Sequence, residues 1–351
     1  MLYKFRQIPA SKKIGISSVD NPNQFLFSFK EPSTFAVEGK VYKSSCVGCL
    51  NPACMKFFSE ELNLQTAELN GLTFDPEDTV CPVDAINWER GARTPSIISE
   101  ICINCGICIR RCPFGAIYSD GKKAVIHLDE PHISFESLSP QNLEKHKNQL
   151  TSARNARHLG HYIDPSECQL KVVYNKISSI QLTQFPNLFI RNLFLVLGNK
   201  CVMRRRGDVY FRIDVIIEDE SQFIGILEVE FGADSLESPR AVLDDFSVIS
   251  SRYNVPKEKI KPYIVFLEFP NRRAEYWQVI KDINNVLEIK INSLTLGSLL
   301  LLLWKHCFIS FSQIESYADV DFPSIRENIS QLSESDNLPE FNNLAILEPI
   351  K

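Results

Sequence analysis

The chain has 351 residues, of which 44% are hydrophobic and 23% are charged, and its formal net charge at pH 7 is −5. This length favours two domains, and the composition is typical of an ordinary globular protein. The negative charge excludes the broad basic field that many nucleic-acid-binding proteins carry, so any contact with nucleic acid must come from a local basic patch.

Eight of the eleven cysteines lie between Cys46 and Cys112. A secreted disulfide scaffold is one explanation for such clustering. The opening residues, MLYKFR, are not followed by an apolar signal region, which favours a reducing, cytoplasmic compartment and metal-binding cysteines. The longest apolar run, Leu299–Trp304, is too short to cross a bilayer and predicts a buried helix.

The second half of this region has the spacing C-x2-C-x2-C-x3-C-P. Its cysteines are Cys102, Cys105, Cys108 and Cys112. Thiolates at this spacing wrap the corners of a cubane iron–sulfur cluster, and Gly106 lets the loop pass close to the inorganic sulfides. Paired C-x2-C motifs alone would also fit zinc, but the full spacing with its proline favours iron–sulfur.

The first half has a different spacing, with Cys46, Cys49 and Cys54 arranged as C-x2-C-x4-C. The next cysteine, Cys81, follows after 26 residues. This insertion, roughly residues 57–79, is long for a loop, so we expect a helix within it. Both halves end in C-P-x-x-A-I, a weak internal repeat that predicts two half-domains.

These motifs resemble those of the bacterial two-[4Fe–4S] ferredoxin family, and the first loop is similar to that of electron-transfer subunits of bacterial molybdenum oxidoreductases. The resemblance implies an α+β ferredoxin-like domain with two [4Fe–4S] clusters and crossed ligation. One cluster would be bound by Cys46, Cys49, Cys54 and Cys112. The other would be bound by Cys81, Cys102, Cys105 and Cys108. The three cysteines that remain are expected to be small hydrophobic residues rather than ligands. They are Cys168, Cys201 and Cys307.

The composition divides the chain into three parts. Residues 1–127 form the predicted two-cluster ferredoxin domain with an N-terminal arm, residues 128–166 a polar linker, and residues 167–351 an α/β domain. Hydrophobic patterns in the third part predict alternating helices and strands, and therefore a mixed central sheet covered by helices. The helices are expected at 185–197, 239–253 and 272–287, and the strands at 209–217, 223–231, 263–269 and 288–294. Ser238 is the expected cap of the second helix.

Acidic residues gather on the predicted hairpin of the α/β domain. Glu228 and Glu230 project to one face of their strand, and Asp214 on the paired strand reaches the same face. Three converging carboxylates suit Mg²⁺ or Mn²⁺, which can activate water for attack on a phosphodiester. A solvated acidic hairpin is the alternative interpretation, and Asp208 is an alternative to Asp214 as the first ligand.

This pattern resembles the restriction-endonuclease-like, PD-(D/E)xK-type nucleases, which have a mixed sheet flanked by helices. The resemblance implies catalytic roles for Asp214, Glu228 and Glu230, with the first two as metal ligands. Glu230 departs from the family, which usually has lysine there. The basic run Arg204, Arg205 and Arg206 is a candidate for phosphate contact, unless it is simply a solvated surface run.

The leading hypothesis is an iron–sulfur protein with a DNA-binding nuclease domain whose cleavage depends on Mg²⁺ or Mn²⁺. The clusters would be structural or redox-sensing. The alternative is a ferredoxin-type electron-transfer protein whose C-terminal domain is a non-catalytic docking module. DNA, a redox partner and a multiprotein complex are the expected partners, and no membrane is expected.

Overall fold

The computed structural model describes the chain in segments. They are residues 53–89, 94–112, 117–122, 124–126, 163, 165–205, 207, 212–232, 235–316, 325–335 and 337–350. The chain divides into two compact units, one of residues 1–56 and 79–163 and the other of residues 57–78 and 164–351. The predicted N-terminal arm, Cys46, Cys49, Arg206 and Asp208 lie outside the described residues.

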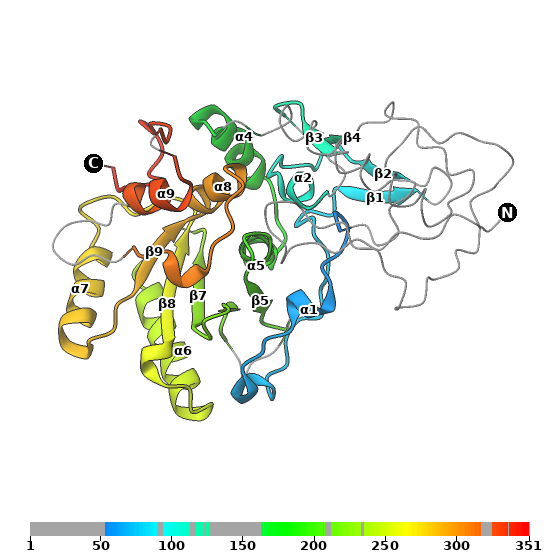
Figure 1. Ribbon diagram of the computed structural model, residues 1–351. Helices are drawn as coiled ribbons and strands as arrows, with labels where there is room; N and C mark the ends of the chain where they lie inside the picture. The colour runs from blue at the N-terminus through cyan, green and yellow to red at the C-terminus, as the bar shows by residue number, and fades with distance from the viewer. Residues whose placement is uncertain are drawn as a thin grey trace, which may run out of the picture. The chain divides into compact units, whose positions relative to one another are not determined.

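The first unit contains the cysteine motifs between short strands. Antiparallel pairing joins β1 (Ile86–Glu89) to β2 (Thr94–Ile97), and it also joins β3 (Ile117–Ser119) to β4 (Ala124–Ile126). The helix α2 (Ile107–Arg111) lies between the two pairs in the chain (Figure 1). Both C-P-x-x-A-I endings lead into the first strand of a pair, so the internal repeat of the sequence is also a repeat of structure.

The second unit is built on one mixed sheet of five strands in the order β5-β6-β7-β8-β9. Their bounds are β5 (Lys200–Met203), β6 (Val215–Glu218), β7 (Ile224–Glu230), β8 (Ile260–Phe266) and β9 (Asn292–Thr295). The first three strands pair antiparallel, and β8 and β9 continue the sheet in parallel with β7. The predicted mixed sheet is therefore confirmed.

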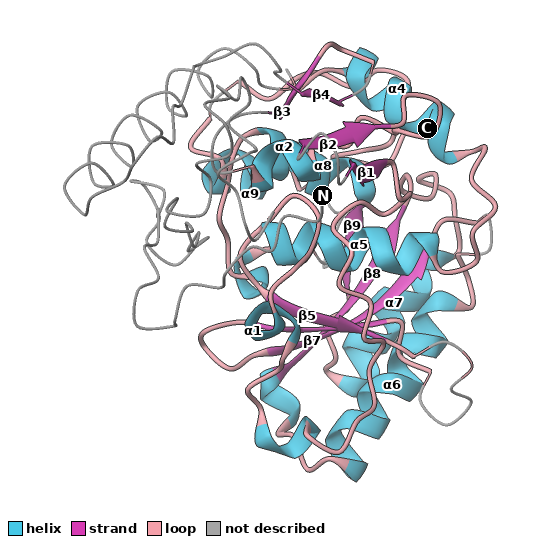
Figure 2. Cartoon of the chain, turned by 90° about the vertical axis from the view of Figure 1, so that its right-hand side faces the viewer, coloured by secondary structure: helices cyan, strands magenta, loops and turns pink. Residues whose placement is uncertain are grey.

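Helices cover both faces of this sheet (Figure 2). One face carries α5 (Phe185–Val196) and α8 (Leu296–Trp304), and the other carries α6 (Ser238–Arg252) and α7 (Tyr276–Leu287). The remaining helices of the described unit are α1 (Ser59–Leu62), α4 (Glu167–Ile177) and α9 (Arg326–Leu332), with short 3-10 turns at Ala67–Leu69, Lys257–Lys259 and Phe311–Gln313. Every residue of α8 is buried, as its apolar run predicts. No helix in the described segments has the length and apolar character needed to cross a membrane.

Some local predictions need correction. Ser238 does not cap α6: the helix begins at Ser238 itself, with Glu237 as its N-cap. Pro239 is tolerated in the first helical turn, which lets the helix begin one residue earlier than expected. Residues 209–211 of the strand predicted at 209–217 lie outside the described residues, and within the described part β6 begins at Val215, so Asp214 lies just before β6 rather than inside it. The short strand β5 carries no alternating pattern, and the sequence did not predict it.

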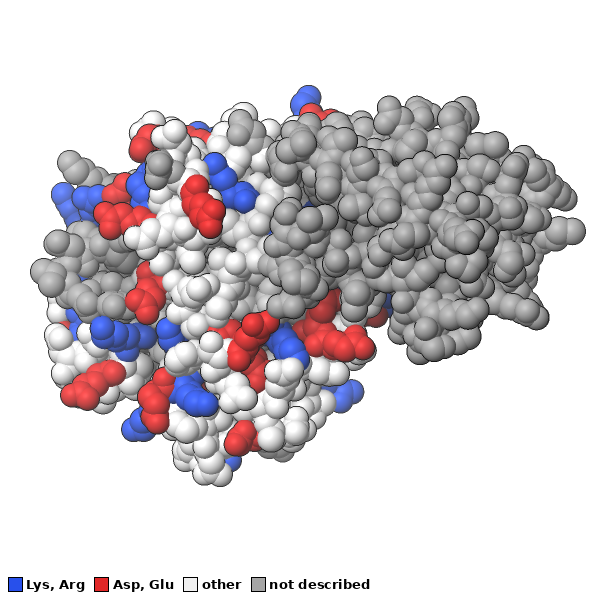
Figure 3. Space-filling model, in the orientation of Figure 1, with Lys and Arg blue, Asp and Glu red and all other residues white. Residues whose placement is uncertain are grey.

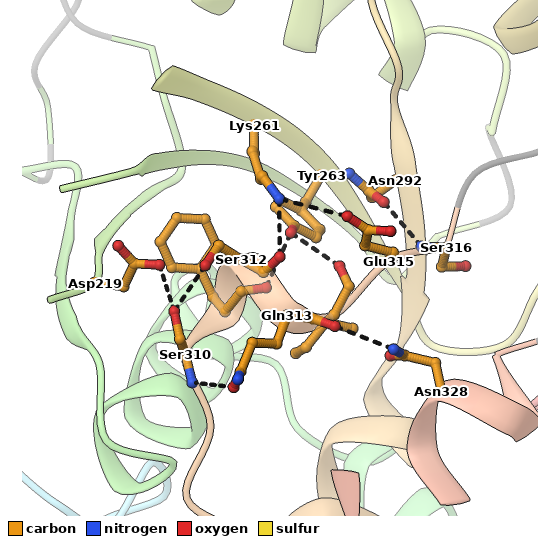
Figure 4. A network of polar contacts seen from close by, with 12 residues as sticks. Asp219, Lys261, Tyr263, Asn292, Ser310, Ser312, Gln313, Glu315, Ser316 and Asn328 are labelled. Carbon is orange, nitrogen blue, oxygen red and sulfur yellow. Dashed lines mark hydrogen bonds and ion pairs between the residues drawn. The ribbon is translucent and has the colours of Figure 1, made fainter. Parts of the chain in front are cut away.

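Polar contacts fasten the segment after α8 to the sheet (Figure 4). The hydroxyl of Tyr263 on β8 donates to the carbonyl oxygens of Phe311 and Ile314, at 3.0 Å each. Lys261 Nζ donates to the carbonyl oxygen of Ser312 at 2.8 Å. The Phe311 ring lies so close to β7 that a Cβ at Gly225 would be 2.8 Å from it, so the strand needs glycine there.

The insertion between Cys54 and Cys81 folds as part of the second unit. Its residues Gln65 and Thr66 donate hydrogen bonds to the buried carboxylate of Glu218 at the end of β6. Arg191 of α5 donates to the carbonyl oxygen of Glu77 at 2.6 Å. The expected helix is present only as the four residues of α1 and one 3-10 turn. Tertiary contacts, rather than a long helix, therefore hold this segment.

Candidate iron-sulfur centre and acidic site

The cysteine loop before α2 surrounds a cavity. Gly106, the N-cap of the helix, has φ 90°, a left-handed conformation that favours glycine. The turn that it allows places three successive cysteines of the motif around this cavity. The cysteines that line this cavity are Cys81, Cys102, Cys105 and Cys108. Apart from Asn104, the other side chains of its lining are apolar.

Burial raises the pKa of the Cys81, Cys105 and Cys108 thiols, and the neighbouring cysteines raise it further. Backbone N–H groups offset part of this effect: Ala85 N donates to Cys81 Sγ at 3.2 Å. Such a group of thiols ionises readily only when a positive partner is present, and iron supplies that charge. Four cysteine sulfurs around a largely apolar cavity are the donor set that an iron–sulfur cluster requires.

Arg111, whose side chain is fully buried, links two segments that each carry a further cysteine. Its Nε donates to the carbonyl oxygen of Ala53 at 2.5 Å, and its Nη2 donates to that of Lys56 at 3.3 Å. These bonds join the loop of Cys54 to the end of α2, directly before Cys112. Both thiols are buried. Crossed ligation requires these two segments to lie together, but Cys46 and Cys49 lie outside the described residues, so the full ligand set stays a prediction.

Asp214 is fixed in place by two hydrogen bonds. Its Oδ1 accepts from Asn187 Nδ2 of α5 at 2.7 Å, and its Oδ2 accepts from Val229 N of β7 at 3.1 Å. Because Val215 pairs with Leu227, the residue before it falls beside Glu228. The two acids predicted as metal ligands are therefore neighbours. Asn187 was not predicted, since it comes from a helix far away in sequence.

The acidic residues at this point repel one another. Burial raises the pKa of Glu228 to about 8, and the charges of Asp214, Asp245 and Glu230 add to the shift. Burial also raises the pKa of Asp214. Within the described residues, no three acidic, histidine or cysteine side chains form a group that would hold a single metal ion. Glu230 is half-buried, and its Oε1 accepts from Gly232 N at 2.6 Å.

Asp245 is an acid of this group that the sequence reasoning missed. It lies on α6 in the buried stripe of Val242, Phe246 and Ile249, and only 6% of it is exposed. Burial, followed by the charge of Asp214, raises its pKa to about 7. A carboxylate in an otherwise apolar helical stripe is the signal that would have revealed it.

The predicted arginines differ in their surroundings. Arg204 is half-buried, and its Nη1 donates to the carbonyl oxygen of Arg212 at 3.3 Å. Its positive charge offsets part of the rise in the pKa of Asp214, Glu228 and Asp245. Arg205 is exposed. On the face shown in Figure 3, basic and acidic side chains of the described residues are interspersed. The predicted contact with nucleic acid is not tested by this arrangement.

We expect the raised pKa values of Glu228 and Asp245 to make the protein, in the absence of Mg²⁺ or Mn²⁺, less stable as the pH rises from about 5 towards 8. Folded Glu228 keeps its proton up to about pH 8, whereas its ordinary pKa is 4.5, so the folded state binds more protons in this window. The free energy of unfolding therefore falls as the pH rises. Denaturant titrations at pH 5.5 and 8.5 would measure the loss.

The Glu228→Gln variant should lose less stability over this pH range than the wild-type protein does. Asp214, Asp245, Glu230 and Arg204 remain in both proteins, so their difference isolates Glu228. Glu220→Gln, at an exposed position, is the matched control and should behave like the wild type. Equal pH dependence in Glu228→Gln and the wild type would contradict the prediction.

Comparison with known proteins gives two similarities to iron–sulfur proteins. Residues 95–118 match the family model described as a 4Fe-4S binding domain. The chain is also 29% identical over 108 residues to an uncharacterized ferredoxin of Methanocaldococcus jannaschii. That alignment covers 29% of this chain and 66% of the relative, slightly less than two thirds of its length. No solved structure matches the chain. With the cysteine-lined cavity, these similarities support iron–sulfur binding by the part of the chain that includes residues 95–118.

Proposed function

We propose that the second unit is a restriction-endonuclease-like module that cleaves a phosphodiester bond of DNA with Mg²⁺ or Mn²⁺. One observation carries the proposal: α5, the antiparallel strands β5 to β7, α6 and the parallel strand β8 follow in the order of that fold, and Asp214 and Glu228 are neighbours on it. Acidic side chains whose pKa is raised by burial and, for Glu228 and Asp245, by neighbouring acidic charges are the surroundings in which a divalent cation relieves repulsion.

In this proposal each residue has a distinct task. Asn187 and the Val229 N–H orient Asp214, which leaves the other lone pairs of its carboxylate for the ion. Glu228 provides the second carboxylate, and Asp245 adds negative charge from α6. The bound ion would polarise the phosphodiester and lower the pKa of the attacking water.

Arg204 compensates for an unusual feature of this site. The nuclease family usually has lysine where this chain has Glu230, so the chain lacks a positive charge at that position. The guanidinium charge of Arg204 offsets part of the rise in the pKa of Asp214, Glu228 and Asp245, which places positive charge close to these carboxylates. It is suited to balance the charge of a phosphate group bound there.

The test is cleavage of supercoiled and linear DNA by the anaerobically purified full chain. Cleavage should require Mg²⁺ or Mn²⁺ and should stop when a chelator is added. A separate absorbance measurement should first establish that this chelator leaves the clusters intact. Parallel assays on oxidised and reduced protein would separate a structural cluster from a redox-sensing one. No cleavage of DNA with either ion would refute the proposal.

For the first unit we propose two [4Fe–4S] clusters with crossed ligation. Two features support it: Cys81 shares a cavity with Cys102, Cys105 and Cys108, and Arg111 links the end of α2 to the Cys54 loop. Two clusters correspond to about eight iron and eight sulfide per chain, which chemical analysis of anaerobic protein would measure.

The ferredoxin similarity favours a second candidate function, in which the clusters pass electrons to a partner enzyme and the second unit is a docking module. This function predicts reversible one-electron reduction at low potential and electron transfer to an oxidoreductase. Metal-dependent cleavage that does not respond to the redox state would favour the nuclease proposal instead.

A further inference from the structure

The amide of Asn104 is an unexplained polar group in the cysteine-lined cavity. Asn104 lies between Cys102 and Cys105 in the motif, only 1% of it is exposed, and it lines the cavity with the four cysteines. Buried polar groups normally have hydrogen-bond partners, because an unsatisfied one costs free energy. The amide of Asn104 therefore requires a hydrogen-bond partner.

A chain of hydrogen bonds orients the amide. Gly121 N donates to Ser119 Oγ at 3.0 Å, and Ser119 Oγ donates in turn to Asn104 Oδ1 at 2.9 Å. The carbonyl end of the side chain is thereby fixed. The other end, Nδ2, is buried and has no hydrogen-bond partner among the described residues. An oriented donor without an acceptor is thus carried by a residue that lies beside a cavity of cysteine sulfurs.

The backbone does not require this side chain. Asn104 has φ 57°, in the left-handed region that glycine adopts most readily. The first motif of the sequence has Gly48 at the corresponding place, two residues after Cys46 as Asn104 is two residues after Cys102. Glycine would therefore satisfy the loop, and the amide is available for a different task.

We propose that Asn104 Nδ2 donates a hydrogen bond to a sulfur of the cluster bound by Cys102, Cys105 and Cys108, and that this bond raises the midpoint potential of that cluster. The sulfurs of an iron–sulfur cluster accept hydrogen bonds, and these bonds help to set its potential. When the cluster takes up one electron from an electrode or a chemical reductant, its sulfurs become more negative. The hydrogen bond then stabilises the reduced form more than the oxidised form.

The test compares Asn104→Gly and Ser119→Ala with the wild type, each as the anaerobically reconstituted full chain. Asn104→Gly should keep its iron content and have a lower midpoint potential. A tenfold change in the reduction equilibrium corresponds to 59 mV for one electron, which is readily measured. Ser119→Ala leaves the backbone at 104 unchanged and frees the amide, so a smaller shift in the same direction is expected.

Pulsed electron paramagnetic resonance in deuterated water supplies the second measurement. The reduced wild-type cluster should show a coupling to an exchangeable deuteron that Asn104→Gly lacks. Asn87→Ala removes an exposed asparagine on β1 of the same unit and should change neither measurement. If Asn104 only packed against the cluster, its replacement by glycine would leave the deuteron coupling unchanged as long as the iron content stayed complete.

An unchanged potential and an unchanged coupling in Asn104→Gly would overturn the proposal. If that variant binds no cluster, Ser119→Ala decides the question, because an unchanged potential in it would equally refute the role of the oriented amide. The inference concerns the first unit alone, so it holds or fails independently of DNA cleavage by the second unit.

Discussion

The Cys105→Ser variant is expected to lose one of two clusters, so that iron and sulfide fall from about eight to about four per chain. Cys105 lines the cavity with three other cysteines, and its thiol is buried there, so no solvent ligand can easily replace it. Iron and sulfide analysis, together with the brown absorbance, measures the loss. Cys168→Ser is the matched control, because Cys168 is an exposed cysteine of the other unit.

A companion variant, Cys112→Ser, tests the crossed ligation. If Cys112 binds the cluster of Cys46, Cys49 and Cys54, its loss and that of Cys105 affect different clusters, and the double variant should lose nearly all iron. If all four cysteines of the second motif bind one cluster, the double variant would keep as much iron as either single variant. The second result would overturn the crossed assignment, and full iron in Cys105→Ser would contradict the cluster site itself.

The Asp214→Asn variant is expected to cleave DNA at least about 100-fold more slowly than the wild type, the scale of losing one group that stabilises charge in a transition state. The substitution removes a negative charge beside Glu228 but keeps the size of the side chain. Iron content should not change, since Asp214 belongs to the second unit. Initial cleavage rates at saturating Mn²⁺ measure the effect.

Asp245→Asn should reduce cleavage less than Asp214→Asn does, because Asp245 acts on the other two acids from α6. Asp244→Asn changes the neighbouring, exposed acid of the same helix and is expected to cleave like the wild type. If Asp214→Asn and Glu228→Gln both cleave at the wild-type rate, the acidic residues are not the catalytic site, and iron–sulfur binding is the chemistry that remains supported.

Local patterns made much of the molecule predictable. The spacing of Cys102, Cys105 and Cys108 is that of a cluster-binding loop, so the sequence predicts that these cysteines line one cavity. The neighbouring positions of Asp214 and Glu228 were also predictable, because a short turn joins β6 to β7 and a hairpin fixes its own register. The mixed sheet followed from the alternation of strand and helix patterns.

Contacts between distant segments were not predictable in this way. Asn187 and Asp245 reach the acidic site only because α5 and α6 pack on opposite faces of the sheet. The prediction that Ser238 caps α6 was wrong because proline is tolerated at more than one position of the first helical turn. Pro239 therefore does not fix which residue precedes the helix. The insertion gave no pattern that assigns it to the second unit, since its contacts with Glu218 and Arg191 involve residues more than 100 positions away.

The insertion also determines where the chain can be divided. Its two ends meet, with Phe57 N donating to the Asp78 carbonyl oxygen at 2.7 Å and Val80 N donating to the Met55 carbonyl oxygen at 3.0 Å. Closing a long flexible loop costs entropy, and the contacts of the insertion within the α/β unit offset part of that cost. The insertion belongs to the second unit, yet it lies within the sequence of the first. A chain cut at residue 163 would therefore leave part of the second unit attached to the first, and the two pieces would not be self-sufficient halves.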